Sequence, residues 1–196
     1  FGDVLAVRGV HLTARDGTVT GLLGPNGAGK TTTLRMLSGL MRPDAGSIRV
    51  DDVDVVADPV GAQRVMGQLP DSRGLYPRLT AREHIEYFAR LHGLASEVTK
   101  ARTARLLTRL GLDAIADRRV AGFSQGERTK VALARALVHA PRNVILDEPT
   151  NGLDVMSTRA MREVIRALRD DGCCVMFSSH IMQEVAALCD RIVIIA

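Results

Sequence analysis

Short apolar runs alternate along this chain with longer stretches that mix apolar and polar residues. Each run has the length of a strand and is largely apolar, which is typical of strands buried on both faces. The pattern predicts an α/β domain with a mostly parallel core sheet covered by helices. The predicted strands are residues 19–23, 144–146, 175–177 and 192–195, and the predicted helices are 29–40, 157–169 and 181–188.

The middle of the chain lacks such apolar runs. From about Thr80 to Ala121 it is rich in helix formers and arginines, with apolar residues at helical spacing. We therefore expect a helical insert, and we place a helical subdomain at roughly 72–121. The remaining residues, roughly 1–70 and 122–196, would form the core.

Two segments in the first third of the chain alternate between apolar and polar residues. They cover residues 5–20 and 46–56, and each is accompanied by a turn signal. The first contains Asp16-Gly17, and the second begins within Asp44-Ala45-Gly46. This pattern predicts a small antiparallel sheet beside the core.

The composition is that of a globular chain. Of 196 residues, 46% are apolar and 24% are charged, which excludes a disordered or collagen-like protein. No apolar stretch approaches the roughly 18 residues that cross a bilayer, so a membrane role would have to come from a partner. The N-terminus does not resemble a secretory signal, and we expect a cytoplasmic protein. The chain starts at Phe1 and ends at Ala196 inside an apolar run, so both ends look trimmed.

Charge and cysteine content narrow the function classes further. The net charge is +4, but the basic residues are spread among 22 acidic ones, and only six residues are aromatic. Nucleic-acid binding is therefore a weak alternative, and no nucleic-acid partner is expected. Cys173, Cys174 and Cys189 lack the spacing of metal ligands, which favours reduced thiols packed in the core.

A glycine-rich stretch directly follows the first predicted strand. Residues 24–31 read Gly-Pro-Asn-Gly-Ala-Gly-Lys-Thr and fit the phosphate-binding pattern G-x-x-x-x-G-K-[ST]. The glycines let backbone N–H groups converge on phosphates, and the helix N-terminus adds its positive end. We expect Lys30 to reach the terminal phosphates and Thr31 to ligate Mg²⁺. The stretch predicts a nucleoside triphosphate site rather than a flexible turn with a solvated lysine.

Polar residues end two of the other predicted strands. The strand 144–146 is followed by Asp147 and Glu148, and the strand 175–177 is followed after two serines by His180. Because α/β folds bind ligands at the carboxyl ends of parallel strands, these side chains are expected at the phosphate site. We predict that Asp147 holds Mg²⁺, that Glu148 orients or deprotonates the attacking water, and that His180 hydrogen-bonds the γ-phosphate or the water.

Residues 124–127 read Ser-Gln-Gly-Glu and open a helical run that continues to Val138. The pattern S-x-x-E is a capping box, in which each side chain satisfies a backbone donor at the start of a helix. A serine-capped helix N-terminus is also an anion site, so the same residues could bind a phosphate presented by another chain. Both interpretations can hold together.

Taken in order, these motifs resemble the nucleotide-binding domain of ATP-binding cassette (ABC) transporters over essentially the whole chain. The resemblance implies a P-loop NTPase fold, Mg²⁺-dependent ATPase activity, and ATP and Mg²⁺ as ligands. Residues 24–32 resemble the Walker A loop, and residues 144–148 resemble the Walker B strand. Residues 123–127 resemble the signature motif, and residues 151–154 resemble the D-loop. His180 resembles the switch histidine, and Phe1-Gly2 resembles the aromatic position that stacks on adenine. The expected nucleotide contacts are Phe1, Gly24, Pro25, Asn26, Gly27, Ala28, Gly29, Lys30, Thr31, Thr32, Ser124 and Gly126, with Thr31 and Asp147 at the metal and Glu148 and His180 in catalysis.

The same resemblance implies how copies and partners assemble. Two such domains would pair head to tail, as a homodimer or a heterodimer, with Ser124 and Gly126 of one copy contacting the ATP held at Lys30 of the other. Hydrolysis at Glu148 would open the dimer and transmit motion to membrane-spanning permease subunits. The protein is then expected at the cytoplasmic face of the cell membrane, as a peripheral subunit.

This sequence departs from the family pattern at two motifs. Pro70-Asp71 stands where the family usually has Pro-Gln, and Gln68 is a candidate substitute for the missing amide. In the signature motif, Gln125 replaces a glycine and Glu127 replaces a glutamine. These changes predict slower or differently regulated hydrolysis.

Residues 71–83 are most similar to the ATPases of bacterial sodium-efflux ABC exporters, with drug and polysaccharide exporters close behind. They also lie in a loop and helix where a partner could dock, although a plain surface loop is the alternative. Two other functions stay open. One is a soluble ABC ATPase that acts in translation or DNA maintenance, and the other is a nucleotide-binding regulatory module with negligible turnover.

Overall fold

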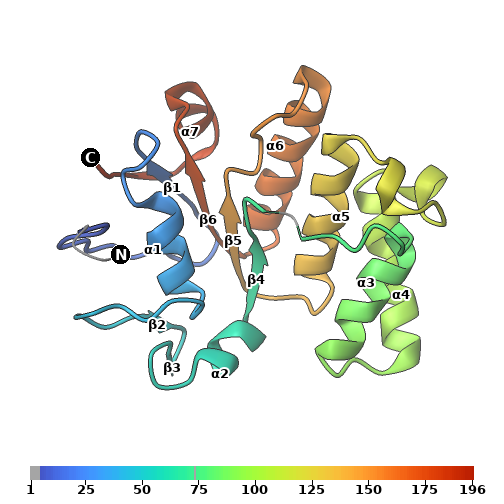
Figure 1. The fold of residues 1–196 in the computed structure, drawn as a ribbon, viewed down its shortest axis with the longest axis horizontal. Coiled ribbons are helices and arrows are strands. Elements are labelled where there is room, and N and C mark those ends of the chain that lie inside the picture. The colour runs from blue at the N-terminus through green and yellow to red at the C-terminus, as the bar shows by residue number, and fades with distance from the viewer. Residues whose placement is uncertain (1–4, 73) are drawn as a thin grey trace. The chain divides into compact units, whose positions relative to one another are not determined.

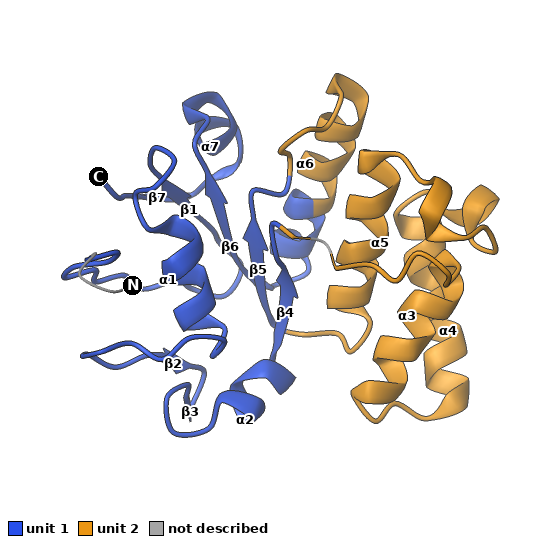
Figure 2. Ribbon diagram, viewed as in Figure 1, with its two compact units in different colours: residues 1–71, 142–149, 165–196 blue, residues 72–141, 150–164 orange. Residues whose placement is uncertain are grey.

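Two compact units make up the chain in this computed structural model, which describes residues 5–72 and 74–196 (Figures 1 and 2). The first unit contains both termini and the parallel sheet, and the second is helical. Unit 1 covers residues 1–71, 142–149 and 165–196, and unit 2 covers 72–141 and 150–164. Among the described helices, none combines the length and the apolarity that crossing a bilayer would require.

Five parallel strands form the sheet of unit 1, in the order β4-β5-β6-β1-β7 (Figure 2). The strands β1, β5 and β6 lie inside the sheet and are buried along nearly their whole length, as their largely apolar sequences predicted. The strands are β1 Val19–Leu23, β4 Met66–Leu69, β5 Asn143–Asp147, β6 Cys174–Ser179 and β7 Arg191–Ile194. The predicted parallel core is therefore confirmed.

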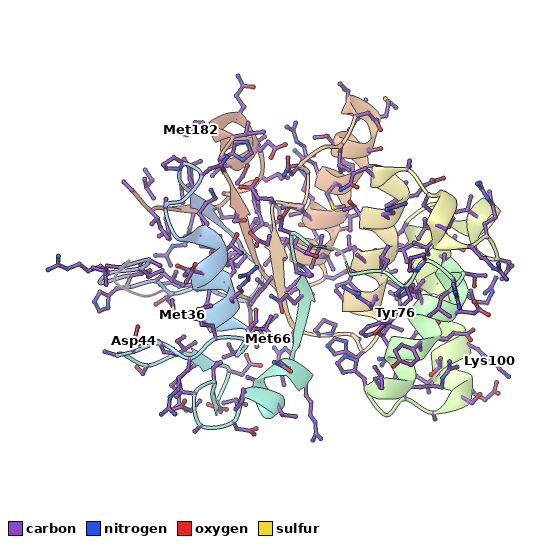
Figure 3. All side chains as sticks on the ribbon, in the orientation of Figure 1. Met36, Asp44, Met66, Tyr76, Lys100 and Met182 are labelled. Atoms are coloured by element: carbon purple, nitrogen blue, oxygen red, sulfur yellow. The ribbon has the colours of Figure 1, made fainter. Side chains whose placement is uncertain are left out.

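Helices cover both faces of this sheet. On one face, Leu22 packs in a core with Leu34 of α1 (Lys30–Leu37) and Ala62 of α2 (Pro59–Arg64). On the other face, the neighbouring Gly21 lies against α7 (Met182–Leu188), which contacts β1 and β6. The first core also contains Met66, which is labelled in Figure 3, and Val55, Ile145, Met176 and Ile195.

The small antiparallel sheet is present but is shorter than the sequence pattern predicts. It consists of β2 (Arg49–Val50) and β3 (Val53–Asp54), which pair as a two-residue hairpin. The prediction that residues 5–20 contribute strands to it was wrong, because residues 5–18 are in no strand. Instead, the side chains on one side of this segment pack against the core; they are Val10, Leu12 and Ala14. The alternation therefore did indicate an apolar face that packs against the core, but the segment that carries it is not a β-strand.

Unit 2 is a helical assembly in which α3, α4 and α5 contact one another in pairs (Figure 2). Apolar faces of these helices bury Ile85, Leu107 and Val131 completely or nearly so. The predicted helical insert lies within this unit, which also includes residues up to 141 and 150–164. The subdomain limits of 72–121 stay a prediction. The helices are α3 Ala81–Leu91, α4 Ser96–Arg109, α5 Gln125–Leu137 and the 3₁₀ turns Asp113–Ile115 and Val120–Gly122, while α6, Val155–Asp170, starts in this unit.

Candidate nucleotide site

The glycine-rich loop connects β1 to α1. Gly27 and Gly29 have φ values of 87° and 91°, which suit glycine and strain other residues. Gly29 is the N-cap of α1 and provides no side-chain cap, and the first turn of the helix contains no acidic residue. A Cβ at Gly29 would lie 2.4 Å from the carbonyl oxygen of Ala6. The amides at this helix start are therefore not capped by a side chain, as a site for an external anion requires.

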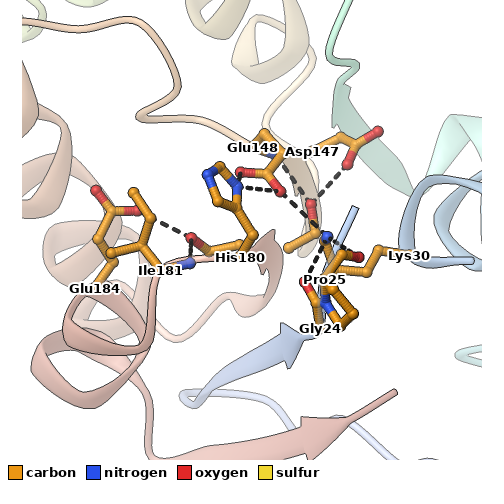
Figure 4. A network of polar contacts seen from close by, with 10 residues as sticks. Gly24, Pro25, Lys30, Asp147, Glu148, His180, Ile181 and Glu184 are labelled. Carbon is orange, nitrogen blue, oxygen red and sulfur yellow. Dashed lines mark hydrogen bonds and ion pairs between the residues drawn. The ribbon is translucent and has the colours of Figure 1, made fainter. Parts of the chain in front are cut away.

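Lys30 is the first residue of α1 and is only 6% exposed. Its Nζ donates hydrogen bonds to the carbonyl oxygens of Gly24 at 2.8 Å and Pro25 at 3.1 Å. The same nitrogen lies 3.5 Å from Oε1 of Glu148 (Figure 4). The ammonium is thus held over the loop with one carboxylate as its ion-pair partner.

Asp147 and Glu148 follow one another at the carboxyl end of β5. Asp147 is 4% exposed, and Ser178 of β6 donates a hydrogen bond from its Oγ to Oδ1 of Asp147 at 2.6 Å. Glu148 has a φ of 46°, a left-handed conformation that costs roughly 1–2 kcal/mol for a residue other than glycine. Its side chain is 12% exposed. Strain of this kind is often found at functional sites.

His180 comes directly after β6. Its Nδ1 lies 3.1 Å from Oε1 and 3.0 Å from Oε2 of Glu148 (Figure 4). Next to it, Ser179 donates a hydrogen bond to Glu184 of α7, at 3.1 Å, and accepts one from the backbone of Ile181. The structure therefore brings together Lys30, Glu148 and His180, three of the residues that the sequence predicts for this site.

The other predicted residues of the loop lie where the motif places them. Gly24 is buried and follows β1, and a Cβ there would lie 2.3 Å from the carbonyl oxygen of Ile195. Pro25, Asn26 and Gly27 are exposed, and Ala28, Thr31 and Thr32 are half-buried, with the threonines in the first turn of α1. Phe1, the predicted adenine contact, lies outside the described residues.

Ser124 and Gly126, the other two predicted nucleotide contacts, belong to unit 2. The capping box is present: Glu127 N donates to Ser124 Oγ at 3.2 Å, and Ser124 N donates to Glu127 Oε2 at 2.7 Å. Glu127 thus uses its carboxylate to cap α5 at its own helix start. Gly126 is buried, and a Cβ there would lie 2.8 Å from Ser157 Oγ.

The departure after β4 lies at the surface of unit 1. Asp71 is exposed, whereas Gln68 is half-buried within β4. Sequence reasoning missed a different residue, Ser178, whose hydroxyl contacts both Asp147 and the backbone of Glu148. The available signal was the pair of serines at the end of an otherwise apolar strand, directly before His180.

Comparison with known proteins identifies the family. A family model described as ABC transporter matches residues 7–151, well over half of the chain. The chain belongs to this family. Its resemblance to ABC nucleotide-binding domains is thereby confirmed, and the chain is an ABC transporter ATP-binding domain of the P-loop fold.

Relatives and solved structures of ABC proteins align along nearly all of the chain. The ABC transporter ATP-binding protein NatA of Bacillus subtilis (strain 168) is 49% identical, over 98% of this chain and 78% of its own length. The linearmycin resistance ATP-binding protein LnrL of the same organism is 38% identical, and the Nod factor export ATP-binding protein I of Burkholderia orbicola is 40% identical. The chain aligns in full with both but spans only 63% and 64% of their lengths.

Two solved structures extend the likeness to three dimensions. The ATP binding subunit of an ABC transporter superposes with a TM-score of 0.89 at 30% identity, covering all of this chain and 81% of that one. A dimeric ATP-binding cassette in a post-hydrolysis state, bound to ADP and Pi, superposes with a TM-score of 0.87 at 25% identity, covering 97% and 86%. Both support the P-loop fold of this ABC domain.

The residues of this ABC domain fit a nucleotide with its metal. Within the described residues, His, Cys, Asp and Glu form no group of three or more that could hold a metal ion by themselves. Asp147 nevertheless provides a buried carboxylate, and Thr31 provides a hydroxyl at the start of α1. Oxygen ligands of this number are typical of Mg²⁺, which usually takes one or two protein ligands together with phosphate oxygens.

Proposed function

We propose that this chain is the Mg²⁺-dependent ATPase subunit of a bacterial ABC exporter and that it couples ATP hydrolysis to export through separate membrane subunits. The observation that carries the proposal is the convergence of Lys30, Glu148 and His180 at the carboxyl edge of the sheet. Phosphoryl transfer depends on positioning and charge stabilisation, and this edge supplies a cation, a carboxylate and an imidazole in contact.

Each residue has a role in the proposed reaction. Lys30 and the amides at the start of α1 bind the phosphates of ATP. Glu148 accepts the proton of the attacking water or orients that water, and His180 hydrogen-bonds the γ-phosphate. Thr31 and Asp147 would hold Mg²⁺, which offsets the negative charge of the phosphates when it is bound.

The proposed working unit is a head-to-tail dimer. Ser124 and Gly126 of one copy would contact the ATP bound at Lys30 of the other, so ATP would join the two copies. Solved structures described as dimeric cassettes support a dimer of such domains. A homodimer and a heterodimer both satisfy it. Permease subunits would hold the dimer at the cytoplasmic face of the cell membrane, as a peripheral component.

Sodium ion is the proposed cargo. The support is the similarity of residues 71–83 to sodium-efflux exporters, together with the 49% identity to NatA over 193 residues. Relatives named for linearmycin resistance and Nod factor export are 38–40% identical, and they favour a drug or a polysaccharide as the second candidate. Uptake of radioactive sodium by inverted vesicles containing the protein and its permease, driven by ATP, would support the first candidate. Uptake of a labelled drug or polysaccharide without sodium would replace it.

Glu148→Gln tests the proposed enzyme. The variant should bind ATP, lose at least about a hundredfold in hydrolysis rate because its proton acceptor is gone, and elute as a dimer in the presence of ATP. Hydrolysis at the wild-type rate would contradict the role of Glu148. Negligible turnover by the wild-type protein would favour the regulatory module, to which Asp71 and Glu127 already point. Recovery of the full-length protein with ribosomes rather than membranes would favour a soluble ABC ATPase.

A further inference from the structure

Two adjacent serines at the end of β6 are completely buried, and each joins a carboxylate to a backbone N–H group. Ser179 donates to Glu184 and accepts from Ile181 N, both on the side of α7. Ser178 donates to Asp147 Oδ1 and accepts from Glu148 N at 3.0 Å, on the side of β5. The pair makes the same chemical bridge twice, and one of the two bridges ends at the proposed catalytic edge.

The direction of the hydrogen bonds at Ser178 is fixed. The N–H group of Glu148 can only donate, so Ser178 Oγ accepts that bond. The hydroxyl proton is then available for Asp147, whose Oδ1 lies 2.6 Å away, the short distance of a charge-assisted bond. One oxygen of the Asp147 carboxylate is thereby committed to Ser178, and Oδ2 is the oxygen that can face a cation.

The sheet register explains why a hydroxyl is needed at this point. Asp147 and Ser178 are the last paired residues of the parallel β5–β6 ladder. Beyond this pair the backbone turns at Glu148, which has its φ of 46°, and the Glu148 N–H group donates to the Ser178 hydroxyl. The Ser178 hydroxyl takes the place of a ladder acceptor, so one side chain fixes both the orientation of Asp147 and the strained backbone of Glu148.

We propose that Ser178 is a positioning residue of this ATPase: its hydroxyl orients Asp147 toward Mg²⁺ and holds the backbone of Glu148 for its work on water. The inference rests on the proposed function. It adds a residue that acts through two neighbours, Asp147 and Glu148. Partners of metal ligands typically contribute about tenfold to a hundredfold in metal affinity or activity, and we expect Ser178 to fall in that range.

The experiment compares Ser178→Ala with Ser179→Ala and Ser178→Thr in the full-length protein. Both alanine variants remove one buried bridge, so both should lower the Tm by several degrees. Only Ser178→Ala should raise the Mg²⁺ concentration for half-maximal hydrolysis, by about tenfold or more, and Ser178→Thr should restore it because it keeps a hydroxyl. The KM for ATP at saturating Mg²⁺ should change little, since the Ser178 hydroxyl bonds Asp147 and the backbone of Glu148, which are not the residues proposed to bind the phosphates.

Two further measurements do not depend on hydrolysis. Ser178→Ala should speed hydrogen exchange at the Glu148 amide, which loses its acceptor, while Ser179→Ala should leave that amide protected. Binding of Mn²⁺ to the ADP-loaded protein, followed by electron paramagnetic resonance, should weaken by about tenfold in Ser178→Ala alone. If the alanine variant does not fold, Ser178→Cys takes its place, because a thiol is a weak donor of similar size.

The outcomes separate this inference from the proposed function. A wild-type protein without Mg²⁺-dependent hydrolysis contradicts the proposed function, while amide exchange and Mn²⁺ binding still decide the role of Ser178. A wild-type ATPase in which Ser178→Ala changes only the Tm overturns the inference alone. Equal changes of metal dependence in Ser178→Ala and Ser179→Ala also overturn it, because the effect would then come from general loosening of β6.

Discussion

Glu148→Gln should make the protein bind ADP about tenfold more tightly when Mg²⁺ is withheld. In the structure, Lys30 is buried and its nearest carboxylate oxygen, on Glu148, lies at 3.5 Å. The phosphates of a nucleotide must share or replace that carboxylate as the partner of the ammonium group. Because Glu148 carries the charge that competes, a neutral side chain of the same shape should favour the phosphates.

The size of the effect follows from the distance. Two unit charges 3.5 Å apart interact by about 5 kcal/mol at an effective dielectric constant of roughly 20. Most of this is cancelled by the cost of removing both groups from water, and Glu148 keeps its two contacts to His180 without Lys30. A remainder of about 1.4 kcal/mol corresponds to a factor of ten in Kd.

Titration with a fluorescent ADP analogue in the presence of a chelator measures this affinity. ADP is used because it is not hydrolysed and lacks the γ-phosphate that would join two copies. Asp147→Asn is the matched control: it removes one negative charge from the same edge, but Asp147 is bonded by Ser178. An unchanged or weaker affinity in Glu148→Gln, or equal tightening in Asp147→Asn, would show that the Lys30–Glu148 pair does not oppose nucleotide binding.

Three further predictions concern stability. Ser124→Ala and Thr80→Ala each break a capping box and should lower the free energy of unfolding by about 1 kcal/mol in urea titrations, but only Ser124→Ala should also weaken ATP-dependent dimerisation. Burial, reinforced by Arg135, lowers the pKa of His84 to about 4. The free energy of unfolding is therefore not reduced by His84 above pH 6.5, the pKa of the unfolded chain, and it falls by up to about 3 kcal/mol as the pH falls toward 4. In His84→Gln, urea titrations over the same pH range should show a smaller loss. Gly29→Ala should lower the Tm by at least about 4 °C in thermal scans, because of its left-handed φ and the close Ala6 carbonyl. An unaltered pH dependence of the free energy of unfolding in His84→Gln, or an unaltered Tm in Gly29→Ala, would contradict the reasoning.

The parallel core could be predicted because most of its strands contain a run of consecutive apolar residues, such as residues 144–146 of β5 and 175–177 of β6. β1 has the bounds that the apolar run indicates, 19–23. β4 lacks such a run, since Gly67 and Gln68 interrupt its four residues. The helix predicted at 29–40 ends at Leu37, and Gly39 follows with a φ of 66°. The bounds of such short elements depend on packing and on strand register, which a single sequence does not show.

More of the proposed catalytic edge than of the surrounding fold could be predicted from the sequence. Parallel strands bring their carboxyl ends together, so Lys30, Glu148 and His180 were expected to meet, and they do. Ser178 was not expected, because the two serines that end β6 are visible in the sequence but do not show which residue they contact. Its role depends on the register that pairs it with Asp147, and only the folded sheet supplies that register.

The close packing of Gly21 against α7 restricts how this protein can vary over evolution. A Cβ at Gly21 would lie 2.5 Å from Cys189 Sγ and 2.9 Å from Val185 Cγ1. Positions 21 and 189 should therefore covary among homologues, with a larger residue at one accompanied by a smaller residue at the other. A strand residue without any chemical role thus constrains which residues are tolerated at the end of a distant helix.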